Sequence, residues 1–171
     1  MKEILKRVSS REYLDKKIDK ELIEKILLAG MSAPCAKQQR AWEFLVCDDK
    51  NLLSQISERC KNHYMAKDGS HAIIVLCNKN KIISPLYVDQ DLAAATENIL
   101  LEATHLNIGS VWLGVAPNEE RMNNIKEIFN LSDDYYAFSI IVLGYPKKEI
   151  VKERKYDESI VHYNKMKDGT K

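Results

Sequence analysis

The chain has 171 residues and a formal net charge of +1, a length that suits a single domain with one core. A nearly neutral chain lacks an overall field that attracts nucleic acid or an anionic membrane, so any basic site must be local. Because the sequence has no run of about eighteen apolar residues and no signal-peptide pattern, we expect a cytoplasmic protein without a membrane span.

The first segment of interest is basic. If residues 7 to 11 run extended, alternation places Arg7, Ser9 and Arg11 on one side, so that two guanidinium groups and a hydroxyl face one anion. Lys152 and Arg154, far along the chain, could close the same site. Alone, an Arg-x-Ser-x-Arg string also fits a solvated basic surface. The segment therefore predicts a phosphate site only with support from other segments.

Helices and strands alternate in the first half of the chain. A helical stripe of apolar residues follows Asp19 and ends near Gly30, with residue types typical of helix caps at both ends. Pro34 then marks a loop. The next elements are buried strands at 42–47 and 72–77, with a helix at 52–60 between them.

Residues 91 to 106 predict a long central helix. Its apolar residues recur at spacings of three and four and cover so much of the circumference that we expect burial almost all round. A second copy of the same helix would cover it simply, which favours a homodimer. Two further strands at 110–115 and 138–143 flank a helix at 118–129. The sequence therefore predicts an α+β fold, with a mixed sheet layered by helices.

Metal and thiol chemistry have little support. Cys35, Cys47, Cys60 and Cys77 are too widely spaced for a zinc pair, and we expect reduced thiols, with Cys47 and Cys77 buried as small hydrophobic residues. The four histidines lack metal-ligand spacing. We expect no metal site and structural roles for the histidines.

Several segments resemble the nitroreductase family, in the family's order and over nearly the whole chain. Residues 33–44 resemble its Pro-Ser-x-x-Asn-x-Gln-Pro-Trp segment, with Cys35 at the serine, Gln38 at the asparagine and Ala41 at the second proline. Residues 90–117 resemble its central helix and following strand more closely. Leu143 to Pro146 and Arg154 to His162 follow in register.

The resemblance implies an intertwined homodimer that binds flavin mononucleotide (FMN) and passes electrons from NAD(P)H to nitroaromatics, quinones or similar planar acceptors. It implies three groups of cofactor-binding residues and no catalytic side chain, because the flavin carries the chemistry. The phosphate group would be bound by Arg7, Ser9, Arg11, Lys152 and Arg154, and Val8 would also contact the cofactor. The ring is contacted by Pro34, Cys35, Ala36 and Gln38 of the other subunit. Its remaining contacts would be Asn62, Leu113 and Gly114. Met65 occupies the position of a family lysine, for which Lys61 or Lys67 could substitute.

No Gly-x-Gly-x-x-Gly motif occurs, so donor and acceptor would share one flavin face in a ping-pong cycle. Two alternatives remain open: a flavin-binding sensor or carrier without turnover, and a dehalogenase or flavin-fragmenting relative. We expect one domain at 1–163 and a polar tail at 164–171. The piece at 156–163 retains apolar residues that could pack on a partner chain.

Overall fold

A computed structural model describes residues 2–166 of the chain. Its helices and strands alternate along the sequence, joined by short 3-10 turns. In chain order they are α1 (Lys2–Lys6), α2 (Lys20–Met31), β1 (Trp42–Cys47), α3 (Lys50–Arg59), β2 (His71–Asn78), α4 (Val88–His105), β3 (Gly109–Gly114), α5 (Glu119–Ile128) and β4 (Tyr135–Gly144).

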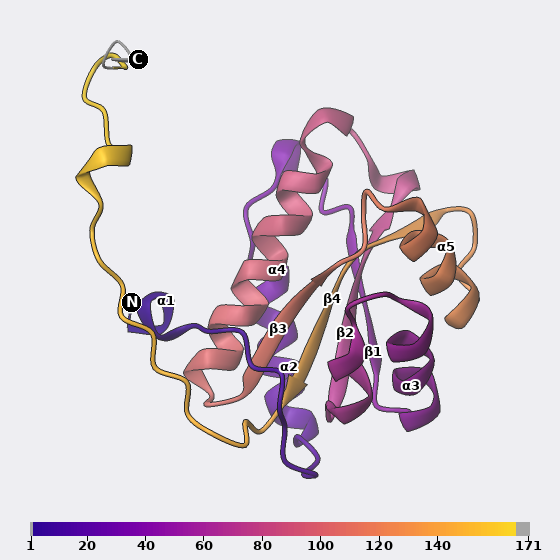
Figure 1. The fold of residues 1–171 in the computed structure, drawn as a ribbon. Helices are drawn as coiled ribbons and strands as arrows, with labels where there is room; N and C mark the ends of the chain where they lie inside the picture. Colours follow the sequence, from indigo (N-terminus) through magenta and orange to yellow (C-terminus); the bar gives the residue numbers. More distant parts are fainter. Residues whose placement is uncertain (1, 167–171) are drawn as a thin grey trace.

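The fold has three layers, with the sheet in the middle. The strands are ordered β1-β2-β4-β3 and every neighbouring pair is antiparallel. Helices α2 and α4 cover one face, and α3 and α5 cover the other (Figure 1). Each face has its own apolar core, so β2, which lies between both cores, is buried at all eight positions. The α+β class predicted from the sequence is confirmed.

Two details differ from the sequence prediction. Residues 42–47 form a strand, but it lies at the sheet edge and only Trp42 and Cys47 are buried, because one side of β1 has no neighbouring strand. The expected mixed sheet is antiparallel in its named strands. Among the described residues, parallel pairing is confined to an isolated bridge between Ser9 and Ser110.

The central helix α4 packs tightly against α2 and the sheet. A Cβ atom on Gly30 of α2 would lie 2.8 Å from Cγ1 of Ile99, so glycine allows the two helices to approach each other. The face of α4 toward the sheet is buried, whereas Ala93, Ala94 and Leu101 on its other face remain partly exposed. Burial almost all round is therefore not reached within one chain.

After β4 the chain forms an arm that passes the N-terminal helix α1 and runs away from the body (Figure 1). Large apolar side chains on this arm are strongly exposed: Val151, Tyr156, Ile160 and Tyr163. A short turn at Glu158–Ile160 is its one helical element within the described residues. Most of the predicted polar tail, from residue 167 onward, lies outside the residues that the structure describes.

Candidate functional site

The structure brings the two basic ends of the chain together. Residues 7 to 10 run beside β3, where Ser9 bridges to Ser110 and the amide of Ser10 donates to the carbonyl of Ser110 at 2.9 Å. Arg154 Nη2 donates to the carbonyl oxygen of Arg7 at 3.1 Å, across 147 positions of sequence. Arg7 Nε lies 3.5 Å from Oε1 of Glu97 on α4, so part of its charge is already compensated.

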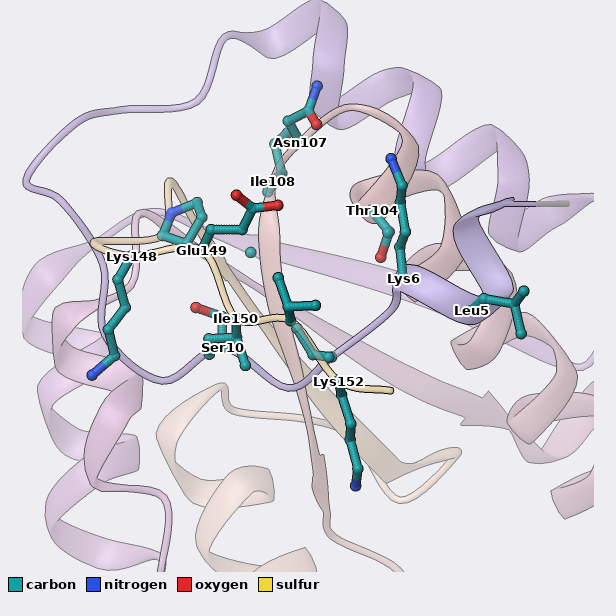
Figure 2. A pocket seen from close by; sticks show the side chains of 14 residues that line it. Leu5, Lys6, Ser10, Thr104, Asn107, Ile108, Lys148, Glu149, Ile150 and Lys152 are labelled. Atoms are coloured by element: carbon teal, nitrogen blue, oxygen red, sulfur yellow. The ribbon is translucent and has the colours of Figure 1, made fainter. Parts of the chain in front are cut away.

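A cavity of about 550 Å³ lies beside this basic cluster. Its walls come from the N-terminal segment, the turn between α4 and β3, and the start of the C-terminal arm (Figure 2). Val8, Ser10 and Lys152 line it, whereas Arg7, Ser9 and Arg11 do not. Alternation along an extended segment explains this split. The side chains of Lys148 and Lys152 point away from Ile108, and Glu149 lies next to it (Figure 2).

A second cluster forms at the other end of β3. Arg121 of α5 donates from Nη1 to the carbonyl of Gly114 at 2.9 Å and from Nη2 to the carbonyl of Lys61 at 3.4 Å. These bonds hold the turn that contains Asn62, a residue with φ of 70°, next to the end of β3. A Cβ atom on Gly114 would meet no atom within 4 Å, so the backbone there borders open space.

The side chains in this cluster differ in whether they are accessible to a ligand. Leu113 is buried in the core between the sheet and α3 and α5, which leaves its backbone for ligand contact. Met65 is also buried, so it offers no group in place of the family lysine. Arg121 was missed as a site residue from the sequence, because its contacts lie 7 and 60 positions away.

His63 is buried in the same cluster and has an unusual environment. Desolvation, together with the charge of Arg121, lowers its pKa to about 4, although a hydrogen bond with the backbone of Gly114 opposes the shift. Its Nδ1 is buried without a hydrogen-bond partner. The imidazole is therefore neutral at neutral pH.

The loop at 34–40 forms the third cluster. The backbone amide of Ala36 donates to Asp91 Oδ1 at 3.0 Å, and Gln39 Nε2 donates to Asp91 Oδ2 at 2.6 Å. Cys35 is half-buried, and Gln38 is exposed. In the sequence, Asp91 is a carboxylate near a helix start, and the sequence analysis assigns no site role to Asp91 or Gln39.

The loop and the cavity lie at opposite ends of α4. Asp91, which binds the loop, and Thr104, which lines the cavity, are separated by about 20 Å along the axis at 1.5 Å per residue. Within one chain, the residues expected at the flavin ring, Pro34 to Gln38, are therefore remote from the cavity that Val8 and Lys152 line.

Within residues 2–166, no group of three or more His, Cys, Asp or Glu side chains is arranged to hold a metal ion. In the same range, no helix has the length and apolar character needed to cross a membrane. All four cysteines are free thiols, and the predicted burial of Cys47 and Cys77 is confirmed. Burial raises the pKa of both of these thiols.

The sheet between two helix layers, with basic residues from both ends of the chain beside β3, defines a nitroreductase fold. The chain belongs to the nitroreductase family: the family model described as "Putative TM nitroreductase" matches residues 1–171.

Relatives and solved structures agree. A protein of Archaeoglobus fulgidus called "Putative NADH dehydrogenase/NAD(P)H nitroreductase" is 44% identical, over 87% of this chain and 86% of its own. A structure titled "Putative NADH Oxidase", from Clostridium acetobutylicum, has a TM-score of 0.93 and 41% identity, over 96% of this chain and 99% of its own. An FMN-dependent nitroreductase of Clostridium difficile has a TM-score of 0.89 and 32% identity, over 97% of this chain and 100% of its own.

Proposed function

We propose that this protein is an FMN-dependent oxidoreductase that takes electrons from NAD(P)H and passes them to a small planar acceptor by a ping-pong mechanism. The single observation that carries the proposal is the basic cluster at the edge of β3, where Arg154 meets Arg7 beside Ser9. The names of the relatives support the same reaction class: a 44% identical protein is called an NAD(P)H nitroreductase, and a 32% identical structure is FMN-dependent.

The donor set fits a mononucleotide. A phosphate monoester carries nearly two negative charges at neutral pH and needs several fixed donors, which three guanidinium groups, an ammonium group and a hydroxyl supply. Arg7, Ser9, Arg11, Lys152 and Arg154 would hold it. At the other end of β3, the open backbone at Leu113 and Gly114 and the turn at Asn62 would border the ring. When bound, the flavin would supply the hydride chemistry.

In the proposed reaction the protein binds the flavin and orients the donor and the acceptor against it. Arg121 supplies a fixed positive charge at the Gly114 carbonyl, and His63 beside it stays neutral. No Gly-rich dinucleotide motif occurs in the described residues. Donor and acceptor would therefore use the same stacking surface in turn, and proton exchange with water requires no dedicated acid.

We also propose that the working unit is a homodimer. The outer face of α4 exposes Ala93, Ala94 and Leu101 in part, and the C-terminal arm exposes several large apolar side chains. A twofold partner whose α4 runs in the opposite direction would carry its own loop, Pro34 to Gln38, across the interface to the flavin site of this chain. That arrangement would unite groups that lie at opposite ends of α4 in one chain.

The test is anaerobic stopped-flow spectroscopy of the purified protein loaded with FMN. We expect about one flavin per chain, reduction by NADH or NADPH, and reoxidation by nitroaromatic or quinone acceptors. A protein that takes up no FMN would refute the proposal. Tight binding without reduction by either donor would instead identify a flavin carrier or sensor.

A further inference from the structure

The loop at 34–40 is held by a buried polar network made of Asp91, Gln39, Ala36, Ile83 and Ser84. Asp91 accepts from the amide of Ala36 and from the side-chain amide of Gln39. Gln39 Oε1 in turn accepts from the backbone amides of Ile83 at 3.0 Å and Ser84 at 2.9 Å. Both side chains are nearly inaccessible, with exposures of 6% for Asp91 and 5% for Gln39.

The chemistry of the network permits one orientation. The oxygen of Gln39 must face the two N–H groups of residues 83 and 84, and its NH₂ must then face Asp91, which can only accept when ionised. Rotating the amide by half a turn would place donors against donors on one side and acceptors against acceptors on the other. The network therefore joins the 34–40 loop, the 83–84 segment and the first turn of α4 in one fixed arrangement.

The loop needs such support because its backbone is unfavourable. Lys37, Gln38 and Arg40 have φ values of 49°, 54° and 43°. This left-handed region is costly for residues with a Cβ atom, and such conformations persist where surrounding bonds impose them. Each of these residues is adjacent to Gln39 or one step further away. The anchored side chain of Gln39 thus lies at the centre of the strained turn.

We propose that Asp91 and Gln39 are positioning residues for flavin binding: their network shapes the loop so that Cys35, Ala36 and Gln38 contact the flavin ring of the partner subunit. This inference rests on the proposed function. It assigns the buried Gln39, and not only the exposed Gln38, to the machinery of the site. This role is visible only in the folded structure, since Asp91 and Gln39 are 52 positions apart in the sequence.

A polarity swap tests the network. Asp91→Asn alone places the new NH₂ against either the amide of Ala36 or that of Gln39. Gln39→Glu alone places two carboxylates within hydrogen-bond distance. In the double variant Asp91→Asn/Gln39→Glu, the new asparagine accepts from Ala36 and donates to the new glutamate, which still accepts from residues 83 and 84. Charge and hydrogen bonds are then both restored.

Cys35 reports on the loop directly. It is half-buried, whereas Cys47, Cys60 and Cys77 are buried, so an aromatic disulfide reagent should react with Cys35 first. In the flavin-free protein we expect each single variant to react about tenfold faster or more, the loss typical of one charge-assisted hydrogen bond. The double variant should return to within about threefold of the wild-type rate. Cys35→Ser confirms which thiol is measured.

FMN titration gives the second readout. FMN should slow Cys35 labelling in the wild type, and each single variant should bind FMN about tenfold more weakly with partial recovery in the double variant. Asp89→Asn is the matched control, because Asp89 lies in the same helical turn but accepts from the hydroxyl of Tyr136. This control should leave both readouts unchanged.

Three results would overturn the inference. The first is a Cys35 labelling rate and an FMN affinity equal to those of the wild type in both single variants. The second is a double variant that recovers neither quantity relative to the single variants, and the third is an Asp89→Asn variant that changes both quantities as much as the single variants do. If a single variant does not fold, the double variant decides, because recovery of both readouts requires the network. A wild-type protein that binds no FMN would defeat the proposed function, while thiol labelling of the flavin-free variants would still show whether the network holds the loop.

Discussion

Replacing Arg154 by alanine removes one of the groups that join the C-terminal arm to the N-terminal segment. Arg154 donates to the carbonyl of Arg7, so the substitution deletes a proposed phosphate contact and the hydrogen bond that keeps Arg7 in place. A hydrogen bond to a charged group contributes about 1.5 to 3 kcal/mol. At about 1.4 kcal/mol per factor of ten, FMN affinity should fall by roughly 10- to 150-fold.

The position of Glu97 beside Arg7 predicts that a substitution of Glu97 affects FMN affinity in the opposite direction. Glu97 lies 3.5 Å from Arg7 and competes with a phosphate for its charge. Glu97→Gln should therefore leave FMN binding unchanged or tighten it by a few fold. The ion pair is partly exposed on both sides, so its loss should cost folding less than about 1 kcal/mol.

Fluorescence titration of FMN into the flavin-free protein at low and moderate salt measures these changes. Lys155→Ala is the control, since Lys155 forms an ion pair with Glu153 on the same exposed arm. Denaturant unfolding of each variant separates binding from folding. Arg154→Ala with an FMN dissociation constant within about twofold of the wild type would place the phosphate elsewhere.

Three further outcomes are expected. Ala94→Glu should separate the proposed dimer into folded monomers in sedimentation experiments, because Ala94 is partly exposed on α4. A dimeric Ala94→Glu protein would contradict the interface. Ala95→Glu should instead unfold the chain, since Ala95 is wholly buried in its own core. The pKa of His63 is lowered to about 4 in the folded state, so unfolded chains should take up the proton preferentially as pH falls from about 6.5 to 4, and the free energy of unfolding should drop by up to about 3 kcal/mol. In urea titrations, the free energy of unfolding of His63→Gln should depend less on pH over this range. The same pH dependence in His63→Gln and the wild type would exclude the burial effect. Steady-state plots against NAD(P)H at several acceptor concentrations should be parallel, whereas intersecting lines would require simultaneous binding of donor and acceptor.

Periodicity was sufficient to locate most elements of this fold. The apolar stripe after Asp19 became α2, and the predicted helix at 91–106 became α4, which starts three residues earlier at Val88. Periodicity reports which faces are apolar, but it does not report strand order. The edge position of β1 depends on which strands lie next to it, so its partial exposure was not predictable from residues 42–47 alone.

The site was predicted less completely, for a physical reason. The proximity of Arg7 and Arg154 was expected from the sequence, because basic residues occur at both ends of the chain in the family's order. The contacts of Gln39 and Arg121 are hydrogen bonds between distant segments. Nothing in the local sequence distinguishes Gln39 from the exposed Gln38 beside it, although their environments are opposite.

The pairing of the N-terminal segment sets the order in which this protein can be completed during synthesis. Ser9 pairs with Ser110, and Tyr13 pairs with Pro146, so residues 9–13 must wait for partners that are synthesised much later. At translation rates of about 5 to 20 residues per second, the delay between Tyr13 and Pro146 is roughly 7 to 27 s. Ser9 has no partner until β3 has been made, and Arg7 lacks the hydrogen bond from Arg154 until the chain after β4 has been made. The nascent chain can therefore assemble its basic cluster only after nearly all of the sheet has been made.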